Sequence, residues 1–425
     1  MRTEVITDRI EAAAELLQRG GLAAVPTETV YGLAGNGLRP EIIEKIYTIK
    51  GRPAVKPISL MVSGEEAIRE LCCDVPEQAI QLAHRFWPGP LTLVLRARAG
   101  IPSVLRAGGE TVGLRCPKQE QTLRLLRMLD FPLAVPSANP SGAPSPKSAE
   151  EVMRYFDGKI EAVIDGGVCD LGIESTVLDM SSVPYRVLRQ GAIPEEEISD
   201  ALTDVLYIVG ITGGSGCGKT TALEPLRERG AAVLDCDEVY HELLQHNTAM
   251  IEELGQRFPE AYRRDCQGGR EAPDPVLCGD PAGSIGSIDR RTLARLVFQD
   301  AGALRDLNGI THRYITEEIR NRLRQHAMQG GRLAALDAVE LIDSGLAEQC
   351  DLLLGVTASE ETRLKRITER DGIGREAALA RIRAQKPETY YRQHCDAVLE
   401  NNGSRSEFLQ KLESVLSERI QAADR

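Results

Sequence analysis

A glycine-rich stretch in the middle of the chain has residue types and spacing suited to binding a triphosphate. Residues 207–221 read YIVGITGGSGCGKTT and contain the pattern G-x-x-x-x-G-K-T at Gly213, Gly218, Lys219 and Thr220. The apolar run before the glycines predicts a strand, and the run after them predicts a helix. Glycines let successive N–H groups point at one phosphate, and the helix adds the positive end of its dipole. Lys219 would reach the β- and γ-phosphates, and Thr220 would offer a hydroxyl to Mg²⁺. The whole phosphate-binding set is Gly213, Gly214, Ser215, Gly216, Cys217, Gly218, Lys219, Thr220 and Thr221.

Two carboxylates follow one βα unit later, at Asp235 and Asp237. Carboxylates after such a strand can act as a general base or hold the water ligands of Mg²⁺. Capping of a helix N-terminus is the alternative for one of them. Two arginine-rich stretches, residues 360–370 and 375–386, predict helices of a lid over phosphates. Many of these arginines are alternatively solvated surface charges.

A second group of cations lies far upstream, at Lys50, Arg52 and Lys56. They fall on a predicted loop between a helix and a strand, where they can surround an anion; a solvated loop of charges is the alternative. Polar turns at 26–36 and 137–142 follow other predicted strands, which is a common place for ligands.

Length and composition limit the classes of protein. A chain of 425 residues predicts two or three domains. The net charge of −12 argues against a basic nucleic-acid coat. Apolar runs are too short for a membrane helix, and the N-terminus lacks an export signal. The ten cysteines include no C-x-x-C pair, so zinc spacing is absent, and we expect reduced thiols and a cytoplasmic location.

Strands and helices alternate in both halves, so we expect an α/β fold throughout. The acidic stretch 191–204 predicts a short connection, giving domains at 1–203 and 205–425. Residues 259–287 are rich in glycine, proline and aspartate, and predict an insertion or mobile loop.

Five motifs occur in order in the first half. They are PTETVYGL from residue 26, KGRP from 50 with KPISL from 56, SANPSG from 137, STVLD from 175 and LRQGAI from 188. Together they resemble the YrdC/Sua5 family over nearly all of residues 5–195. The resemblance implies a YrdC-like α/β domain with a twisted mixed sheet. It also implies synthesis of threonylcarbamoyl-AMP from L-threonine, bicarbonate and ATP, which feeds the t6A modification of tRNA. Partners among the t6A machinery and a weak contact with tRNA follow as expectations.

The same resemblance assigns site residues in the first half. Those expected at the threonine and carbamate pocket are Thr27 and Tyr31. Lys50, Arg52 and Lys56 are expected to bind the ATP phosphates, with Ser59 beside them. Of these, Lys50 and Arg52 are expected to act as catalytic cations. Arg115, Ser137 and Asn139 are expected to contact threonine or the nucleotide. Ser175 and Arg189 are expected on the phosphate and adenylate side.

The second half resembles dephospho-CoA kinase. The motifs are GITGGSGCGKTT from residue 210, GAAVLDCD from 230, the run GSIDRRTLARLVF from 286 and CDAVLENNG from 395. The resemblance implies a P-loop kinase with a parallel sheet and a helical lid, which transfers the γ-phosphate of ATP to the 3′-hydroxyl of dephospho-CoA. The implied roles are general base for Asp237, charge stabiliser for Lys219, Mg²⁺ ligand for Thr220, lid arginine for Arg370, adenine neighbour for Asn402, and acceptor side for Asp235 and Arg290. The stretch 337–343, DAVELID, departs from the family pattern on the acceptor side.

The sequence therefore predicts a bifunctional fusion that uses ATP and Mg²⁺ in both halves. An alternative is that the first half is a non-catalytic nucleotide- or RNA-binding module attached to an active kinase. A third hypothesis is a degenerate, regulatory kinase half, because residues 337–343 are altered.

Overall fold

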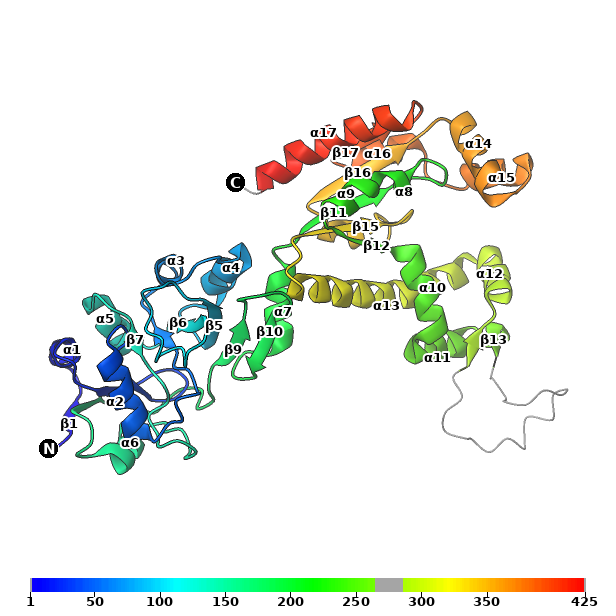
Figure 1. Cartoon of the computed structure of the whole chain (residues 1–425). Helices are drawn as coiled ribbons and strands as arrows, with labels where there is room; N and C mark the ends of the chain where they lie inside the picture. Colours follow the sequence, from blue (N-terminus) through cyan, green and yellow to red (C-terminus); the bar gives the residue numbers. More distant parts are fainter. Residues whose placement is uncertain (1, 264–285, 424–425) are drawn as a thin grey trace, which may run out of the picture. The chain divides into compact units, whose positions relative to one another are not determined.

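The computed structural model describes residues 2–263 and 286–423 (Figure 1). The chain divides into two compact units. The first comprises Met1–Val205 with Ala327–Gly330, and the second comprises Leu206–His326 with Gly331–Arg425.

The first unit is built on one ten-stranded sheet. In spatial order its strands are β1 (Glu4–Ile6), β8 (Ala162–Ile164), β2 (Ala23–Val25), β3 (Gly32–Asn36), β7 (Leu133–Ala134), β4 (Leu60–Met61), β6 (Thr111–Arg115), β5 (Leu91–Arg96), β9 (Thr176–Asp179) and β10 (Arg186–Arg189). Neighbours such as β1 and β8 are parallel, whereas β5 and β6 are antiparallel. The expected mixed sheet is thus confirmed.

Seven helices of the described residues cover this sheet. They are α1 (Ile10–Gln18), α2 (Pro40–Lys50), α3 (Glu66–Leu71), α4 (Glu77–Phe86), α5 (Glu120–Met128), α6 (Ala149–Phe156) and α7 (Glu195–Thr203). On one side, Ile10 and Leu17 of α1 pack with Leu125 of α5 and with strand residues such as Ala23 and Ile164 in a buried cluster. This apolar core fixes the strands whose ends carry the polar turns.

The acidic stretch 191–204 is not the linker that the sequence predicts. Residues 195–203 form α7, which packs against α4 and buries Ile198, Ala201 and Leu202. Pro194 ends the preceding loop, and three glutamates in the first turn favour the positive end of the helix dipole. The acidic residues that led to the prediction of a linker therefore form the N-terminal turn of a helix.

The second unit has a five-stranded sheet in the order β12 (Ala232–Asp235), β15 (Leu333–Asp337), β11 (Tyr207–Thr212), β16 (Leu352–Thr357) and β17 (Ala397–Glu400). All of its neighbouring strands are parallel, as predicted. Val209, Ile211 and Leu354 lie in the core beneath Phe408 and Leu412 of α17 (Arg405–Ala423).

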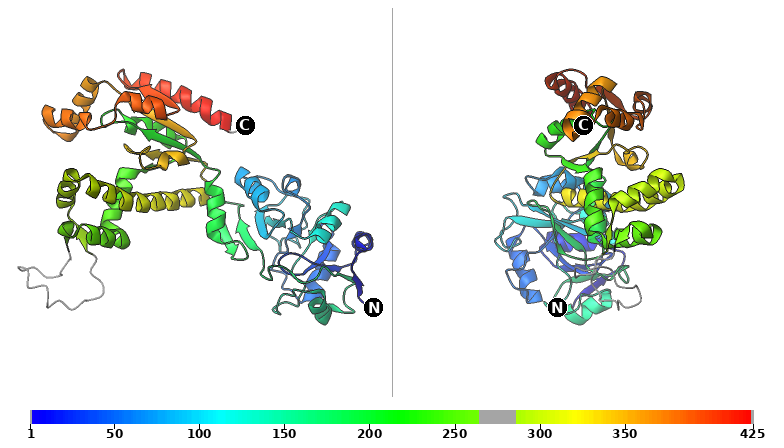
Figure 2. Two further views of the ribbon diagram at one scale, coloured as in Figure 1. Left: turned by 180° about the vertical axis from the view of Figure 1, so that it is seen from behind. Right: turned by 90° about the vertical axis from the view of Figure 1, so that its right-hand side faces the viewer.

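The remaining helices of this unit form two groups. Helices α10 (Cys236–His246), α11 (Thr248–Arg257) and α12 (Arg290–Gln299) gather at one end of the long α13 (Ala301–Met328), and α10 follows directly from β12 of the sheet (Figures 1 and 2). Of the others, α8 (Lys219–Ala222), α9 (Glu224–Glu228) and α16 (Glu388–His394) pack against strands of the sheet, and α14 (Glu360–Asp371) packs on α15 (Arg375–Arg383). The short 3₁₀ turn η1 (Pro259–Ala261) packs against α11 and α12, and a second 3₁₀ turn, η2, spans Leu346–Gln349.

Two local expectations need correction. The single helix expected after the P-loop breaks at Leu223, and α9 begins at Glu224 with Pro225 in its first turn. The expected loop at 259–287 begins and ends in a small antiparallel pair, β13 (Tyr262–Arg263) with β14 (Ser287–Ile288), and its part at 264–285 lies outside the described residues.

Among residues 2–263 and 286–423, every helix is too short or too polar to cross a lipid bilayer.

Candidate functional sites

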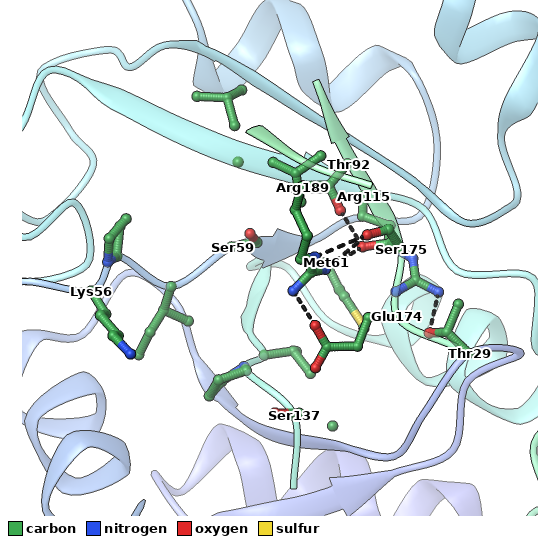
Figure 3. Close-up of a pocket in the computed structure, with 18 of the residues that line it drawn as sticks. Thr29, Lys56, Ser59, Met61, Thr92, Arg115, Ser137, Glu174, Ser175 and Arg189 are labelled. Atoms are coloured by element: carbon green, nitrogen blue, oxygen red, sulfur yellow. Dashed lines mark hydrogen bonds and ion pairs between the residues drawn. The ribbon is translucent and has the colours of Figure 1, made fainter. Parts of the chain in front are cut away.

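A cavity of about 560 Å³, named here the N-terminal cavity, opens over the strands of the first unit (Figure 3). Its polar lining residues are Thr29, Tyr31, Arg52, Lys56, Ser59, Thr92, Thr111, Arg115, Ser137, Glu174, Ser175 and Arg189. Four cations and one carboxylate therefore surround the space, which favours an anionic ligand.

Arg115, at the end of β6, is buried on one side of this cavity. Its Nη2 donates to Glu28 Oε1 and to Thr29 Oγ1, each at 2.8 Å. The second oxygen of Glu28 accepts from the backbone N–H of Lys118 at 2.9 Å. Because its partners are themselves bonded, the guanidinium is held in one orientation. Figure 3 shows it next to Thr29, with Lys56 across the cavity.

Arg189, on β10, lies close to Ser175. Its Nε and Nη2 donate to the Ser175 carbonyl at 3.1 and 2.9 Å, and Nη2 also donates to Ser175 Oγ at 3.1 Å. Glu174 forms an ion pair with Arg189 and accepts from Ser145 Oγ at 3.0 Å. Ser175 Oγ is in turn 2.9 Å from Thr92 Oγ1. Guanidinium, carboxylate and two hydroxyls thus form one connected polar edge (Figure 3).

Arg52 and Lys56 are the two cations of the N-terminal cavity that have no carboxylate within ion-pair distance among the described residues. Arg52 donates to the backbone carbonyls of Lys56 and Pro57 at 3.0 and 2.8 Å, which curls the loop around its side chain. Burial lowers the pKa of Arg52. An anion entering the cavity would relieve this uncompensated positive charge.

Lys50 does not line the N-terminal cavity. Its side chain is buried at the end of α2, and Nζ donates to the backbone carbonyls of Ser137 and Asn139. Burial, with a smaller contribution from Arg52, lowers the pKa of Lys50 to about 7. In this structure Lys50 fastens the turn that starts at Ser137, and Ser137 itself does line the cavity.

The structure brings together eight of the eleven residues expected at this site, and these are Tyr31, Arg52, Lys56, Ser59, Arg115, Ser137, Ser175 and Arg189. The other three are Thr27, Lys50 and Asn139. Thr27 Oγ1 donates to the Val30 carbonyl at 2.7 Å and supports the loop from beneath. The Asn139 side chain donates to the carbonyls of Pro140 and Ala143.

Sequence reasoning missed Thr29, Glu28 and Glu174. Glu28 and Thr29 lie within the motif PTETVYGL, and Glu174 directly precedes STVLD, so the motifs were the available signal. Only the structure shows that these residues reach the cavity or its arginines.

In the second unit, residues 213–218 form a phosphate loop before α8. Gly213 and Gly218 have φ of 147° and 99°, and an added Cβ would lie 2.2 Å from the Val356 carbonyl oxygen and from Asn401 Nδ2, respectively. Both positions therefore require glycine. Lys219 Nζ donates to the Gly213 carbonyl at 3.2 Å, across the mouth of the loop.

Side chains from elsewhere hold the carbonyl groups of this loop. Arg363 Nε donates to the Ser215 carbonyl at 2.9 Å, and Asn401 Nδ2 donates to the Cys217 carbonyl at 2.8 Å. Gln385 accepts from the Ser215 N–H and donates to its Oγ, each at 2.9 Å. Because these partners bind the carbonyls, the loop is fixed as a rigid cradle.

A cavity of about 570 Å³, the P-loop cavity, lies over this cradle. Its residues are Gly214, Ser215, Gly216, Gly218, Lys219, Thr220, Asp235, Asp237, Asp337, Val339, Arg366, Glu369, Arg370 and Arg381. It therefore combines the predicted phosphate loop, both predicted aspartates and the predicted lid arginine.

The two aspartates after β12 differ in environment. Asp235 Oδ1 accepts from the N–H groups of Asp237 and Glu238 at 2.9 and 3.2 Å, so Asp235 caps α10. The Asp237 side chain is exposed and lines the P-loop cavity. The capping alternative thus applies to Asp235, and Asp237 is the one free to meet a ligand.

Asp337, at the end of β15, is a site residue that the sequence analysis did not assign. It is 6% exposed, its Oδ1 has no hydrogen-bond partner among the described residues, and that atom lies 3.9 Å from Lys219 Nζ. Burial raises the pKa of Asp337 to about 6, against the opposing effect of Lys219. Its position beside β11 in the parallel sheet, at the level of Ile211, could have identified it.

Five other expected residues lie outside the lining of the P-loop cavity. Gly213, Cys217 and Thr221 belong to the loop and α8 but do not face the space. Asn402 is exposed, and its Oδ1 accepts from the Ser359 N–H at the start of α14; its neighbour Asn401 contacts the phosphate loop instead. Arg290 lies on α12 and contacts His241 Nε2.

A further cavity of about 550 Å³, the distal cavity, lies next to the P-loop cavity. Most of its lining residues come from α10, α13 and the 338–346 stretch, including Tyr240, Asn308, His312 and Glu340, and the rest are Ser215, Arg381 and Gln385. Asp237 lines both cavities. A group held in one could therefore react with a group held in the other.

Two family models match the chain. Residues 15–191 match the Sua5/YciO/YrdC model, described as "Telomere recombination", and residues 207–407 match the CoaE model, described as "Dephospho-CoA kinase".

Curated relatives fall into the same two groups. The chain is 44% identical over 207 residues to a threonylcarbamoyl-AMP synthase of Pyrococcus abyssi, covering 49% of this chain and 61% of that protein. It is 36% identical over 272 residues to that of Bacillus subtilis, covering 64% and 79%. It is 31% identical over 211 residues to a dephospho-CoA kinase of Corynebacterium glutamicum, covering 49% and 98%.

A solved structure of P. abyssi Sua5 with L-threonine is 27% identical and covers 87% of this chain and 98% of that one, with a TM-score of 0.46. Enzymes of both groups use ATP. The matches confirm the two resemblances: the chain belongs to both families, as a fusion of a Sua5/YrdC-type threonylcarbamoyl-AMP synthase domain with a dephospho-CoA kinase domain.

Proposed function

We propose that this chain catalyses two reactions, one in each unit. The observation that carries the proposal is that each unit holds its own cavity of more than 500 Å³ with several cations, and that only the second uses a phosphate loop. Two separate anion sites are what two ATP-dependent reactions require.

In the second unit the reaction is phosphorylation of the 3′-hydroxyl of dephospho-CoA. The loop N–H groups and Lys219 hold the β- and γ-phosphates, and the distal cavity holds the acceptor. Asp237, which lines both cavities, accepts the proton of the acceptor hydroxyl. Arg370 lines the P-loop cavity and stabilises charge on the phosphates.

The P-loop cavity also fits Mg²⁺. Thr220 supplies a hydroxyl, and the unpartnered Asp337 Oδ1 is a buried carboxylate oxygen in the same cavity. Hydroxyl and carboxylate oxygens are the donors that this ion prefers. The ion, when bound, neutralises charge that develops on the phosphates.

In the first unit the reaction is formation of threonylcarbamoyl-AMP from L-threonine, bicarbonate and ATP. Arg52 and Lys56 are the cations without carboxylate partners, and they suit the phosphates and the leaving pyrophosphate. Arg115, Ser137 and Thr29 suit the carboxylate and hydroxyl of threonine. No protein nucleophile is needed, because the carbamate itself attacks phosphorus once positioned. We further propose that the product serves tRNA modification in the cytoplasm.

The direct test is to incubate the purified chain with ATP, bicarbonate and threonine, and separately with ATP and dephospho-CoA, and to identify products by mass. We expect threonylcarbamoyl-AMP with pyrophosphate in the first reaction and CoA with ADP in the second. A non-catalytic nucleotide-binding first unit would give CoA alone, and a degenerate kinase unit would give threonylcarbamoyl-AMP alone.

A further inference from the structure

The P-loop cavity and the distal cavity share one wall. Four residues line both: Ser215, Asp237, Val339 and Arg381. A phosphoryl group that moves from a nucleotide on the phosphate loop to an acceptor in the distal cavity must pass this wall. Of the four residues, Asp237 is anionic and Arg381 is the cation, so Arg381 is the side chain whose charge complements the moving group.

Arg381 is held by a carboxylate that also holds Arg370. Asp371 Oδ2 accepts from Arg381 Nη1 at 2.9 Å and from Arg370 Nη2 at 3.0 Å, while Asp371 Oδ1 accepts from Arg370 Nε at 2.6 Å. Asp371 is outside the lining of both cavities, whereas both arginines line the P-loop cavity. One carboxylate thus keeps two guanidinium groups next to the same space.

The backbone around this cluster is fixed by packing. Leu364 and Ile367 of α14 pack on Ala378 and Ile382 of α15 in a small apolar cluster. Gly372, with φ of 63°, ends α14 directly after Asp371 and turns the chain toward α15. Because Ile382 is buried in the cluster, the backbone of its neighbour Arg381 is fixed in position.

We propose that Arg381 is a second catalytic arginine of the kinase unit and that Asp371 is the positioning residue that holds Arg370 and Arg381 together. This inference rests on the proposed kinase function. In the transfer, the acceptor oxygen bonds to the γ-phosphorus, and its proton goes to Asp237. The bond to the β,γ-bridging oxygen breaks, and its electron pair stays on ADP. Arg381 contacts the phosphoryl oxygens during this exchange.

The test compares Arg381→Ala and Arg381→Lys with the control Arg383→Ala in the full-length chain. Arg383 lies on the same helix, is exposed, and lines neither cavity. We expect kcat for CoA formation to fall about 10²-fold in Arg381→Ala, with KM for ATP within about threefold, as for loss of one transition-state donor. Arg381→Lys should recover part of the loss, and Arg383→Ala should stay within about twofold of wild type. Equal kcat values for Arg381→Ala and Arg383→Ala would overturn the proposal.

Asp371→Asn and Asp371→Glu test the positioning role. We expect kcat to fall about tenfold in Asp371→Asn, with recovery in Asp371→Glu and an unchanged thermal midpoint, because a charged partner orients a guanidinium better than an amide does. A lower thermal midpoint of unfolding, together with an unchanged kcat when the rate is normalised to the number of ATP-binding sites, would show a purely structural role. That result would contradict the proposal. If the wild-type chain itself forms no CoA, the proposed kinase function fails; if wild type is active and Arg381→Ala equals it, only the role of Arg381 fails.

Discussion

Buried cations set the chemistry of the first unit at the scale of single residues. Arg115 has Glu28 as a buried partner, and the two have side-chain exposures of 8% and 4%. Such a pair gives little net stability but fixes orientation, because removal of either partner leaves an uncompensated charge. Among the described residues, the hydrogen-bond partners of Lys50 Nζ are all neutral: the backbone carbonyls of Ser137 and Asn139 and, at 3.5 Å, Asn139 Oδ1. Its burial therefore costs more than that of Arg115.

The pKa of Lys50 leads to a prediction about stability and pH. This pKa is about 7 in the folded protein and 10.5 for the ordinary side chain. Between these values the unfolded chain binds one more proton than the folded chain, so the free energy of unfolding rises with pH across this window. The slope should be up to about 1.4 kcal/mol per pH unit. Below pH 7 both states are protonated, and this contribution no longer changes with pH.

Urea unfolding followed by Trp87 fluorescence measures this effect, because Trp87 is the single tryptophan of the chain and lies in the first unit. Lys50→Met should remove the rise between pH 7 and 10. Equal slopes for the variant and wild type would show that Lys50 keeps its ordinary pKa.

Asp237 gives a second prediction at this scale. Its side chain is exposed and lines both cavities of the kinase unit, whereas the proposed phosphate-binding groups are the loop N–H groups and Lys219. We therefore expect Asp237→Asn to lower kcat for CoA formation by about 10²- to 10⁴-fold, the usual contribution of a general base. The Kd for ATP, measured by calorimetry, should change little. Unchanged turnover would exclude Asp237 as the base.

At the scale of elements, helix α7 shows that an acidic stretch of sequence can form a helix with a buried apolar face. Ile198 and Leu202 are 0% and 1% exposed, so the helix is part of the core of the first unit. Ile198→Ala should destabilise this unit by about 2–5 kcal/mol, as for other large-to-small core changes. Glu197→Ala, on the exposed side, is the matched control and should change stability by less than about 0.5 kcal/mol. If residues 191–204 were only a connection, the Trp87 unfolding curve would not move in either variant.

Long apolar patterns made many elements predictable from sequence. The apolar pattern predicts a helix at residues 10–18 and a strand at 91–96, and the structure has α1 and β5 with these bounds. The spacing of GGSGCGKT likewise predicts the strand before the loop and the helix after it. Short strands such as β3 were not predicted, because GLAGN consists mostly of small residues and has no alternation of apolar and polar residues. Helix α5 escaped as well, since its apolar face is narrow within a polar segment.

The candidate sites were predictable where one motif carries the chemistry. Lys219 and Asp237 meet in one cavity because parallel strands end at the same edge of the sheet. Lys50 and Asn402 do not line the cavities in which they were expected. A sequence motif identifies such a residue but does not show the direction of its side chain. Arg381 and Asp371 are ten residues apart, and only the packing of α14 on α15 shows that they meet.

At the scale of the whole molecule, two units with separate cavities predict two separable activities. Lys219→Ala removes the ammonium of the P-loop cavity and should abolish CoA formation, while threonine-dependent pyrophosphate release persists. Arg52→Ala removes a cation of the N-terminal cavity that has no carboxylate partner within ion-pair distance among the described residues, and it should do the reverse.

Both assays use the same preparation of each variant, so each activity is the internal control for the folding of the chain. We expect each variant to lose one activity by at least about 10²-fold, the effect of removing one transition-state donor, and to keep the other within about twofold. Loss of both activities in either variant would contradict independent sites. It would mean that the two units, although each has a complete cavity, act as one catalytic system.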